Sequence, residues 1–136
     1  MTIEYRWVLA SGSAVLFTAY EELREKIAQS VNLSTGKTNE IKVGEVCYFI
    51  GSEQQSIPYR WRYKISKGKL LNVCYDEIEY SGSASAPGSD KANRIIYFEA
   101  VAKGTCSIIL KYGRYGAKWN DDDVNEEYTF NIVISD

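Results

Sequence analysis

Apolar and polar residues alternate in short runs over most of the chain from residue 31 onward. A run with a period of two buries one face of a β-strand and leaves the other face exposed. Glycine and small polar residues separate the runs, as they do at the turns between strands. About seven strands at this spacing predict a mostly β protein, folded as an antiparallel β-sandwich. The clearest strands are expected at 46–50, 59–63, 70–80, 94–101, 106–112 and 128–134.

The alternation also predicts which side chains face the core. The residues expected to share one face of their strand are Leu71, Val73 and Tyr75; Ile96, Phe98 and Ala100; Cys106, Ile108 and Leu110; and Tyr128, Phe130 and Ile132. Trp61, in a run where aromatics alternate with arginines, is expected in the core as well. The basic residues Arg60, Arg62, Lys64, Lys67 and Lys69 are expected on a solvated face.

The first 30 residues follow a different pattern. After a short strand expected at 3–9, apolar residues recur at intervals of three and four, opposite a side rich in Glu, Arg and Lys. The periodicity predicts an amphipathic helix over 14–29, with Ser13 as its N-cap. The apolar side of the helix consists of Leu16, Tyr20, Leu23 and Ile27.

An alternative interpretation makes residues 7–19 the apolar part of a signal peptide, with Arg6 as a thin basic region. Phe17 would then stand three residues before a cleavage point after Ala19, where a small residue is usual. We prefer the helix. The chain is therefore expected to consist of an N-terminal extension over 1–30 and a β-sandwich over 31–136.

The lengths of the connections predict where a partner would bind. If successive strands run up and down, the longer loops at 52–58, 81–93 and 113–125 fall at one end of the sandwich. The tight turns at 66–69 and 102–105 then fall at the other end. This asymmetry is typical of a scaffold that presents loops to a partner.

Composition excludes several classes of function. The chain has 136 residues, which suits one domain, and a net charge of −2, which argues against nucleic acid as a partner. No run approaches the roughly 20 apolar residues needed to span a membrane, so no membrane partner is expected. The chain has no histidine, and its three cysteines form no CxxC pair, so we expect no metal site and no cofactor. No pair of side chains is spaced for acid–base catalysis, and an enzyme is not expected.

Three motifs occur in order along the sandwich. Val43-Gly44-Glu45 precedes an apolar strand, and Tyr59-Arg60-Trp61 follows the first long loop. Gly104-Thr105 begins a strand that leads to Tyr112-Gly113-Arg114-Tyr115. On these motifs residues 31–136 resemble the chagasin-type inhibitors of papain-like cysteine peptidases. The resemblance implies an immunoglobulin-like sandwich that inserts three loops as a wedge into the peptidase cleft.

The resemblance also implies which residues would contact a peptidase. Residues 54–58 stand where the family carries Asn-Pro-Thr-Thr-Gly, and 86–89 stand in its glycine-rich second loop. Arg114 stands at the arginine of the family's Tyr-x-Arg-Pro-Trp loop, and this chain continues with Tyr115-Gly116 in place of Pro-Trp. Ile57, Tyr115 and Trp119 are candidate apolar anchors. The expected binding residues are Gln54, Gln55, Ser56, Ile57, Pro58, Tyr59, Pro87, Gly88, Ser89, Arg114, Tyr115 and Trp119.

The expected partner is therefore a papain-like cysteine peptidase, bound by a monomer of this chain. The alternative is an immunoglobulin-like protein-binding or adhesion module without inhibitory activity. Cytoplasmic and periplasmic or secreted locations both remain open.

Two further expectations concern packing. In an immunoglobulin-like sandwich, Cys47 and Cys106 would lie on the two strands that a disulfide commonly joins. We expect free thiols instead, because a buried free cysteine packs well as a small hydrophobe, and the disulfide is the alternative. On the other face of the same sheet, apolar side chains would point away from the core, and the N-terminal helix is expected to cover part of them. They are Tyr48, Ile50, Ile95 and Tyr97.

Overall fold

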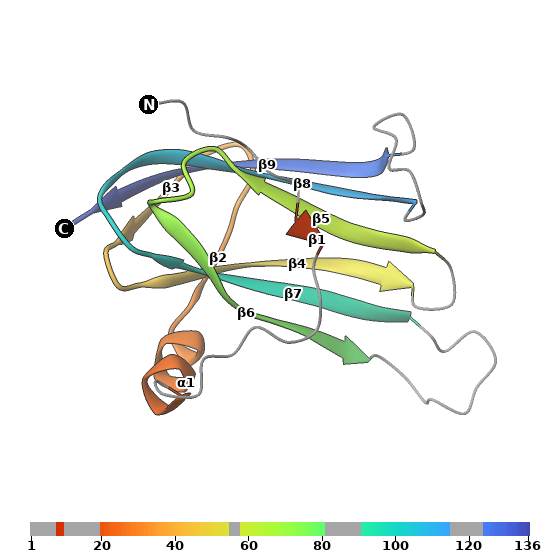
Figure 1. Cartoon of the computed structure of the whole chain (residues 1–136), viewed down its shortest axis with the longest axis horizontal. Helices are drawn as coiled ribbons and strands as arrows, with labels where there is room; N and C mark the ends of the chain where they lie inside the picture. The colour runs from red at the N-terminus through yellow and green to blue at the C-terminus, as the bar shows by residue number, and fades with distance from the viewer. Residues whose placement is uncertain (1–7, 10–19, 55–57, 81–90, 115–123) are drawn as a thin grey trace.

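The computed structural model of the chain describes residues 8–9, 20–54, 58–80, 91–114 and 124–136. Within these residues the chain forms one helix and nine strands (Figure 1). The elements are β1 (Val8–Leu9), α1 (Tyr20–Ala28), β2 (Val31–Asn32), β3 (Thr38–Lys42), β4 (Val46–Gln54), β5 (Tyr59–Ile65), β6 (Leu71–Tyr80), β7 (Lys91–Ala100), β8 (Gly104–Arg114) and β9 (Val124–Ser135). The mostly β fold predicted from the alternation is confirmed.

The strands form two sheets that pack face to face (Figure 1). One sheet has the order β1-β5-β8-β9-β3, and the other has the order β2-β4-β7-β6. The sandwich is confirmed, and two details differ from the expected antiparallel arrangement of about seven strands. The described residues contain nine strands, and β2 runs parallel to β4 while β3 runs parallel to β9. The chain passes from the edge of one sheet at β2 to the edge of the other at β3, and no hairpin turn joins either strand to its neighbour.

Large apolar side chains from both sheets fill the space between them. Trp61, Phe98 and Ile132 are completely buried. Phe49 packs edge-to-face on Trp61 with ring centroids 4.7 Å apart, a geometry that stabilises the core beyond the area it buries. The in-phase residues predicted on β7, β8 and β9 are found in this core, with Tyr128 at its margin, 36% exposed and within ring contact of Trp61.

The alternation fails at one place in β6. Its pairing with β7 shifts by one residue between Val73 and Tyr75, so Cys74 is an extra residue in the strand. A β-bulge of this kind reverses the faces of the residues that follow it. Val73 packs against the core, whereas Tyr75 stacks on Tyr97 on the outer face, with ring centroids 5.9 Å apart. The prediction that Tyr75 shares a face with Leu71 and Val73 was therefore wrong, and Asp76 is buried in its place.

The basic residues of β5 and the turn after it do not form one solvated face. Lys67 and Lys69 are exposed, and Arg60 and Lys64 are half-buried. Arg62 is only 6% exposed, so the expectation was wrong for this residue. In register, Arg62 stands between Leu9 of β1 and Lys111 of β8, so the run does not form an open edge of the sheet.

The N-terminal helix is confirmed over 20–28 as α1. Residues 14–19 and the expected cap Ser13 lie outside the described residues, as does most of the strand expected at 3–9. Of that strand, β1 is present, and it pairs with β5. No helix among the described residues has the length and apolar character that crossing a membrane would take.

α1 packs on the outer face of the four-stranded sheet (Figure 1). Ile27 contacts a small cluster formed by Val46, Ile95 and Tyr97, and Lys26 Nζ lies 2.6 Å from Glu99 Oε2. The prediction that the helix covers part of this face is confirmed. The cover is partial, because Ile50 on the same face is 40% exposed.

All three cysteines lie within the described residues and are free thiols. Cys47 and Cys106 both face the core, as predicted. Burial raises the pKa of Cys47 to about 12, and the neighbouring Cys106 adds to the shift. A thiol kept protonated in this way is a poor nucleophile, so Cys47 serves packing.

Candidate functional site

Three connections join β4 to β5, β6 to β7, and β8 to β9. The strand ends that flank them lie at one end of the sandwich, which we call the loop end (Figure 1). Pairing within the sheets brings their bases together, because Gln54 pairs with Lys91 and Tyr59 pairs with Arg114. The strand ends that flank the three longer loops are grouped as predicted, and the loops lie for the most part outside the described residues.

The short turns lie at the opposite end. There the amide of Val101 donates a hydrogen bond to the carbonyl of Leu70 at 2.8 Å, which joins the turn after β7 to the turn before β6. Gly104 begins β8 at the same end with a φ of +148°, and a Cβ on it would lie 2.8 Å from Leu70 Cδ1. This end is closed by tight local packing, so the loop end is the one that offers room for a partner.

The strands reach further into the predicted loops than the sequence suggested. β4 continues through Ser52, Glu53 and Gln54, and β7 begins at Lys91 instead of Arg94. The third connection is shorter too, because β8 runs to Arg114 and β9 begins at Val124. These residues are polar, but the backbone ladder between neighbouring strands does not depend on side-chain polarity. The sequence therefore predicts loops at these polar residues, whereas the structure shows that the strands continue through them.

Four of the twelve predicted binding residues are described by the structure. Pro58 and Arg114 are exposed, whereas Gln54 and Tyr59 are half-buried. The structure brings Tyr59 and Arg114 together as partners across β5 and β8, and the Tyr112 ring lies 5.8 Å from that of Tyr59. The other predicted residues lie outside the described residues: Gln55, Ser56, Ile57, Pro87, Gly88, Ser89, Tyr115 and Trp119. A binding role for any of the twelve stays a prediction.

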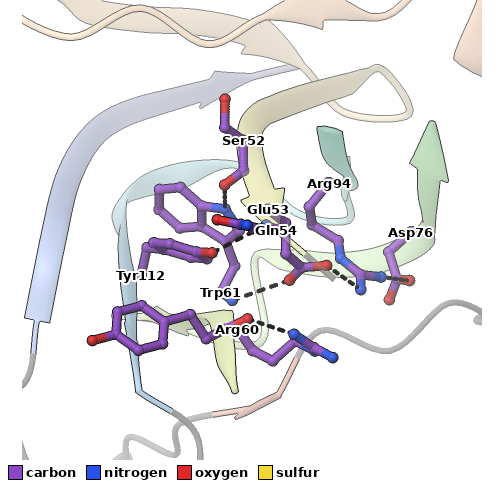
Figure 2. A network of polar contacts seen from close by, with 9 residues as sticks. Ser52, Glu53, Gln54, Arg60, Trp61, Asp76, Arg94 and Tyr112 are labelled. Atoms are coloured by element: carbon purple, nitrogen blue, oxygen red, sulfur yellow. Dashed lines mark hydrogen bonds and ion pairs between the residues drawn. The ribbon is translucent and has the colours of Figure 1, made fainter. Parts of the chain in front are cut away.

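A buried charge cluster lies beneath the loop end (Figure 2). Arg94 Nη2 donates to Glu53 Oε2 at 2.8 Å, and Arg94 Nη1 donates to Asp76 Oδ1 at 3.3 Å. None of the three side chains is more than 5% exposed. Charges removed from water in this way are tolerated only when they are paired and hydrogen-bonded. The planar guanidinium donates to both carboxylates through its two Nη atoms, while its buried Nε has no hydrogen-bond partner among the described residues.

Glu53 extends this cluster to the opposite sheet. Its Oε1 accepts a hydrogen bond from the amide of Trp61 at 3.4 Å, and Trp61 Nε1 donates to the carbonyl of Ser52 at 2.8 Å (Figure 2). Ser52 and Glu53 are among the last three residues of β4, and Trp61 lies near the start of β5. The two bonds therefore hold the base of the first connection from both sides.

Tyr112 connects the third loop to the first. The amide of Gln54 donates to the Tyr112 hydroxyl at 3.2 Å, and the Tyr112 ring lies 5.0 Å from that of Trp61 (Figure 2). Burial raises the pKa of Tyr112, and the bond from Gln54 opposes that shift. The hydroxyl thus stays protonated near neutral pH and serves as a hydrogen-bonding group at the end of β8.

The sequence analysis missed the buried charges. Arg94 is in phase with Ile96 and Phe98, and this phase alone would have placed its side chain inside the sandwich. Asp76 gave no such signal, because the bulge in β6 reverses its face. Glu53 was assigned to a loop. Of the three charged side chains, only Arg94 has a burial that the alternation along its strand predicts.

The chemistry of the loop end suits contact with a protein. A groove of about 380 Å³ opens beside it, lined among others by Gln54, Lys91, Asn93 and Glu126. Its lining mixes both signs of charge with amide groups, unlike the mostly apolar pockets that hold small molecules. No cluster of three or more Cys, Asp or Glu residues that could hold a metal ion occurs in the described part of the chain. The loop end therefore carries polar and aromatic groups on strand ends that are hydrogen-bonded to one another.

Comparison with known proteins assigns the chain to a group with this architecture. A family model described as "Chagasin family peptidase inhibitor I42" matches residues 32–134. The crystal structure of EhICP2, a cysteine protease inhibitor from Entamoeba histolytica, is similar with a TM-score of 0.65 and 19% identity, over 77% of this chain and 95% of that one. The solution structure of amebosin is similar with a TM-score of 0.59 and 20% identity, over 78% of this chain and 96% of that one. No curated protein sequence matches the chain significantly. At these identities the two solved structures show a shared fold.

Proposed function

Because this chain belongs to the chagasin family of peptidase inhibitors, we propose that it inhibits papain-like cysteine peptidases by inserting its loop end into the active-site cleft. The observation that carries the proposal is the family match over residues 32–134, which spans all three connections of the loop end. The structurally similar EhICP2 of Entamoeba histolytica, a cysteine protease inhibitor, supports the same class of target.

The inhibitor acts as a wedge that fills the cleft and offers no bond for cleavage. Binding of this kind depends on a few anchoring side chains and on loops that are ordered before they meet the enzyme. The hydrogen bonds at the bases of the first and third loops support such prior ordering. Because no cysteine or serine of the inhibitor forms a covalent bond with the peptidase in this mechanism, inhibition is reversible.

Each loop has a proposed part. The first connection, after Gln54 and before Tyr59, enters beside the catalytic cysteine with Ile57 as its apolar anchor. The second connection contributes Pro87, Gly88 and Ser89. The third holds one rim of the cleft through Arg114, whose guanidinium can donate in a plane to carboxylates or carbonyls. Gln55, Ser56, Pro58, Tyr115 and Trp119 complete the proposed contact surface.

One copy of the chain presents all three connections at one end, so the inhibitor acts as a monomer. The groove beside the loop end carries both Lys91 and Glu126. Mixed charges at the rim of an interface favour specificity and fast association more than tight binding. The affinity must therefore come from the anchoring residues of the loops.

The test is titration of papain and of a cathepsin-like peptidase with the purified full-length protein, with the serine peptidase trypsin as the control for class. We expect loss of papain activity at micromolar inhibitor or below, no loss of trypsin activity, and an intact inhibitor after long incubation. No inhibition of either cysteine peptidase at micromolar protein would contradict the proposal. That outcome would favour a protein-binding module without inhibitory activity.

A further inference from the structure

We propose that Arg94 is a positioning residue for inhibition, which fixes the bases of the binding loops in the arrangement that fits a peptidase. The inference rests on the proposed function of the loop end. Arg94 cannot itself touch a partner, because its side chain is 5% exposed and lies between the sheets. Its effect on binding must be transmitted through the groups it holds.

The contacts of Arg94 reach the strands on both sides of it. β7 lies between β4 and β6 in its sheet, and the guanidinium donates to Glu53 on β4 and to Asp76 on β6. Through Glu53 Oε1 the link continues to the amide of Trp61 on β5. One side chain thus joins the end of β4, where the first connection begins, to the middle of β6 and the first half of β7, the two strands that flank the second connection (Figure 2).

The third connection joins the same chain of contacts one residue further along β4. Gln54, next to Glu53, donates its amide to the Tyr112 hydroxyl on β8. A shift of the end of β4 would therefore move the base of the third loop as well. The route consists of direct hydrogen bonds and ion pairs, with donor–acceptor distances of 2.8 to 3.4 Å.

Stability alone does not explain a buried cluster of this kind. A buried ion pair is often no more stabilising than well-packed apolar residues of similar volume, because the charges lose their hydration. What the cluster provides is fixed geometry, since the planar fork of an arginine accepts its two carboxylates only in certain directions. Because the cluster lies beneath the binding loops, we infer that its fixed geometry serves binding.

A positioning role predicts a particular change in kinetics. If only a fraction of free molecules hold the loops in the competent arrangement, the apparent affinity falls by that fraction. The loss appears in the association rate constant, whereas removal of a direct contact appears mainly in the dissociation rate constant. Arg94→Lys keeps the charge but replaces the planar fork with a point donor, so it tests geometry at constant charge.

The experiment measures association and dissociation rate constants for papain with the full-length wild type, Arg94→Lys and Glu99→Gln. Glu99 lies on the same strand as Arg94, β7, at the end away from the loops, and it pairs with Lys26 of α1. The Glu99→Gln variant therefore removes an ion pair without touching the cluster. We expect Arg94→Lys to lower the association rate constant about tenfold with the dissociation rate constant unchanged within about twofold. Glu99→Gln is expected to leave both unchanged. Equal rate constants for Arg94→Lys and the wild type would overturn the inference, as would a change confined to dissociation.

A second measurement keeps this inference separate from the proposed function. Amide hydrogen exchange of the free protein reports the bonds from Gln54 and Trp61 whether or not the wild type inhibits papain. We expect both amides to exchange about tenfold faster in Arg94→Lys, while the amides of Gly44 and Val101, which bond carbonyls at the opposite end, keep their rates. Unchanged exchange at Gln54 and Trp61 would overturn the inference. A wild type that exchanges as expected but does not inhibit would contradict the proposed function alone.

If Arg94→Lys does not fold, Asp76→Asn replaces it in both measurements. The asparagine oxygen can still accept from Arg94 Nη1 without the charge, so the cluster is weakened at one arm only. The same pattern is expected, with a smaller change in the association rate constant. An Asp76→Asn protein with wild-type association and wild-type exchange would overturn the inference.

Discussion

The indole of Trp61 lies so close to Gly51 that a Cβ at residue 51 would stand 2.6 Å from Trp61 Cζ2. The same Cβ would stand 2.7 Å from Cζ of Phe49, so no side chain at position 51 fits without movement of the aromatic core. Gly51 lies on β4 and Trp61 lies on β5, which belong to different sheets and stand on either side of the first connection. A glycine at this point lets Trp61 reach across the sandwich and bond the carbonyl of Ser52.

Replacement of this glycine tests that relationship. Gly51→Ala is expected to lower the free energy of unfolding by about 1–3 kcal/mol, because overpacking forces core side chains out of their preferred positions. Gly68→Ala is the matched control, since a Cβ at residue 68 meets nothing within 4 Å. Urea unfolding followed by tryptophan fluorescence measures both. Equal stability of the two variants would show that Trp61 can move away from Gly51 at little cost.

The helix α1 should stabilise the sandwich through Ile27. This half-buried side chain packs on the cluster of Val46, Ile95 and Tyr97, so Ile27→Ala is expected to cost about 1–2 kcal/mol of the free energy of unfolding. Glu25→Ala changes an exposed side chain on the same helix and should cost less than about 0.5 kcal/mol. Chemical denaturation of the two variants decides the matter. A loss no larger for Ile27→Ala than for Glu25→Ala would mean that α1 adds nothing to stability.

Stability should fall in alkali. Burial raises the pKa of Cys47 from 9.0 to about 12 and that of Tyr63 from 10.0 to about 12, the latter with help from Asp76. A group whose pKa is higher in the folded protein binds more protons there, so its contribution is fully present below the unfolded pKa and is lost as pH rises through the folded value. Unfolding free energies measured between pH 7 and 11 should therefore decline above pH 9.

The Cys47→Ala variant is the control for this pH dependence. It lacks one of the shifted groups, so its stability should decline less steeply between pH 9 and 11 than that of the wild type. Its lower stability at pH 7, from the cavity it creates, does not affect the slope. A wild-type stability that stays level to pH 11 would contradict the assigned burial of these groups.

The sequence predicted much of this fold because burial in a sandwich alternates along each strand. The set Ile96, Phe98 and Ala100 shares a face as predicted, and Trp61 is in the core, as expected from the buried tryptophan that immunoglobulin-like sandwiches carry on the corresponding strand. The grouping of the long loops followed from counting strand directions. All of these depend on local pattern and on short-range geometry, which a sequence carries directly.

The rest depends on contacts between distant residues. The bulge at Cys74 has no mark in the sequence, so the faces of Tyr75 and Asp76 were exchanged. Glu53 and Arg94 are 41 positions apart, and only the pairing of β4 with β7 brings them together. For the proposed binding site, the sequence predicted which strand ends lie together. The end of β4 and the start of β7 were expected to be loops, because polarity does not show whether a backbone ladder continues.

Arg114 offers a direct test of the third loop. Its side chain is exposed at the end of β8, so truncation should not disturb the fold. Arg114→Ala is expected to weaken binding to papain by about 1–3 kcal/mol, as the loss of an anchoring residue does, with no change in unfolding free energy. Lys103→Ala removes an exposed charge at the opposite end, where the side chain is 72% exposed, and should leave binding unchanged. Equal affinities of the two variants would exclude Arg114 from the contact surface. Trp119→Ala is expected to weaken binding to the same extent as Arg114→Ala.

The central claim is that the loop end enters the cleft of a papain-like peptidase. Amide hydrogen exchange of the full-length protein, alone and saturated with papain, measures this most directly. We predict that exchange slows on binding in peptides that cover 52–60, 80–92 and 112–124, and that it is unchanged in peptides that cover the turns at 66–69 and 101–104. Protection at those turns, or on the outer faces of the sheets, with none at the loop end would contradict the account.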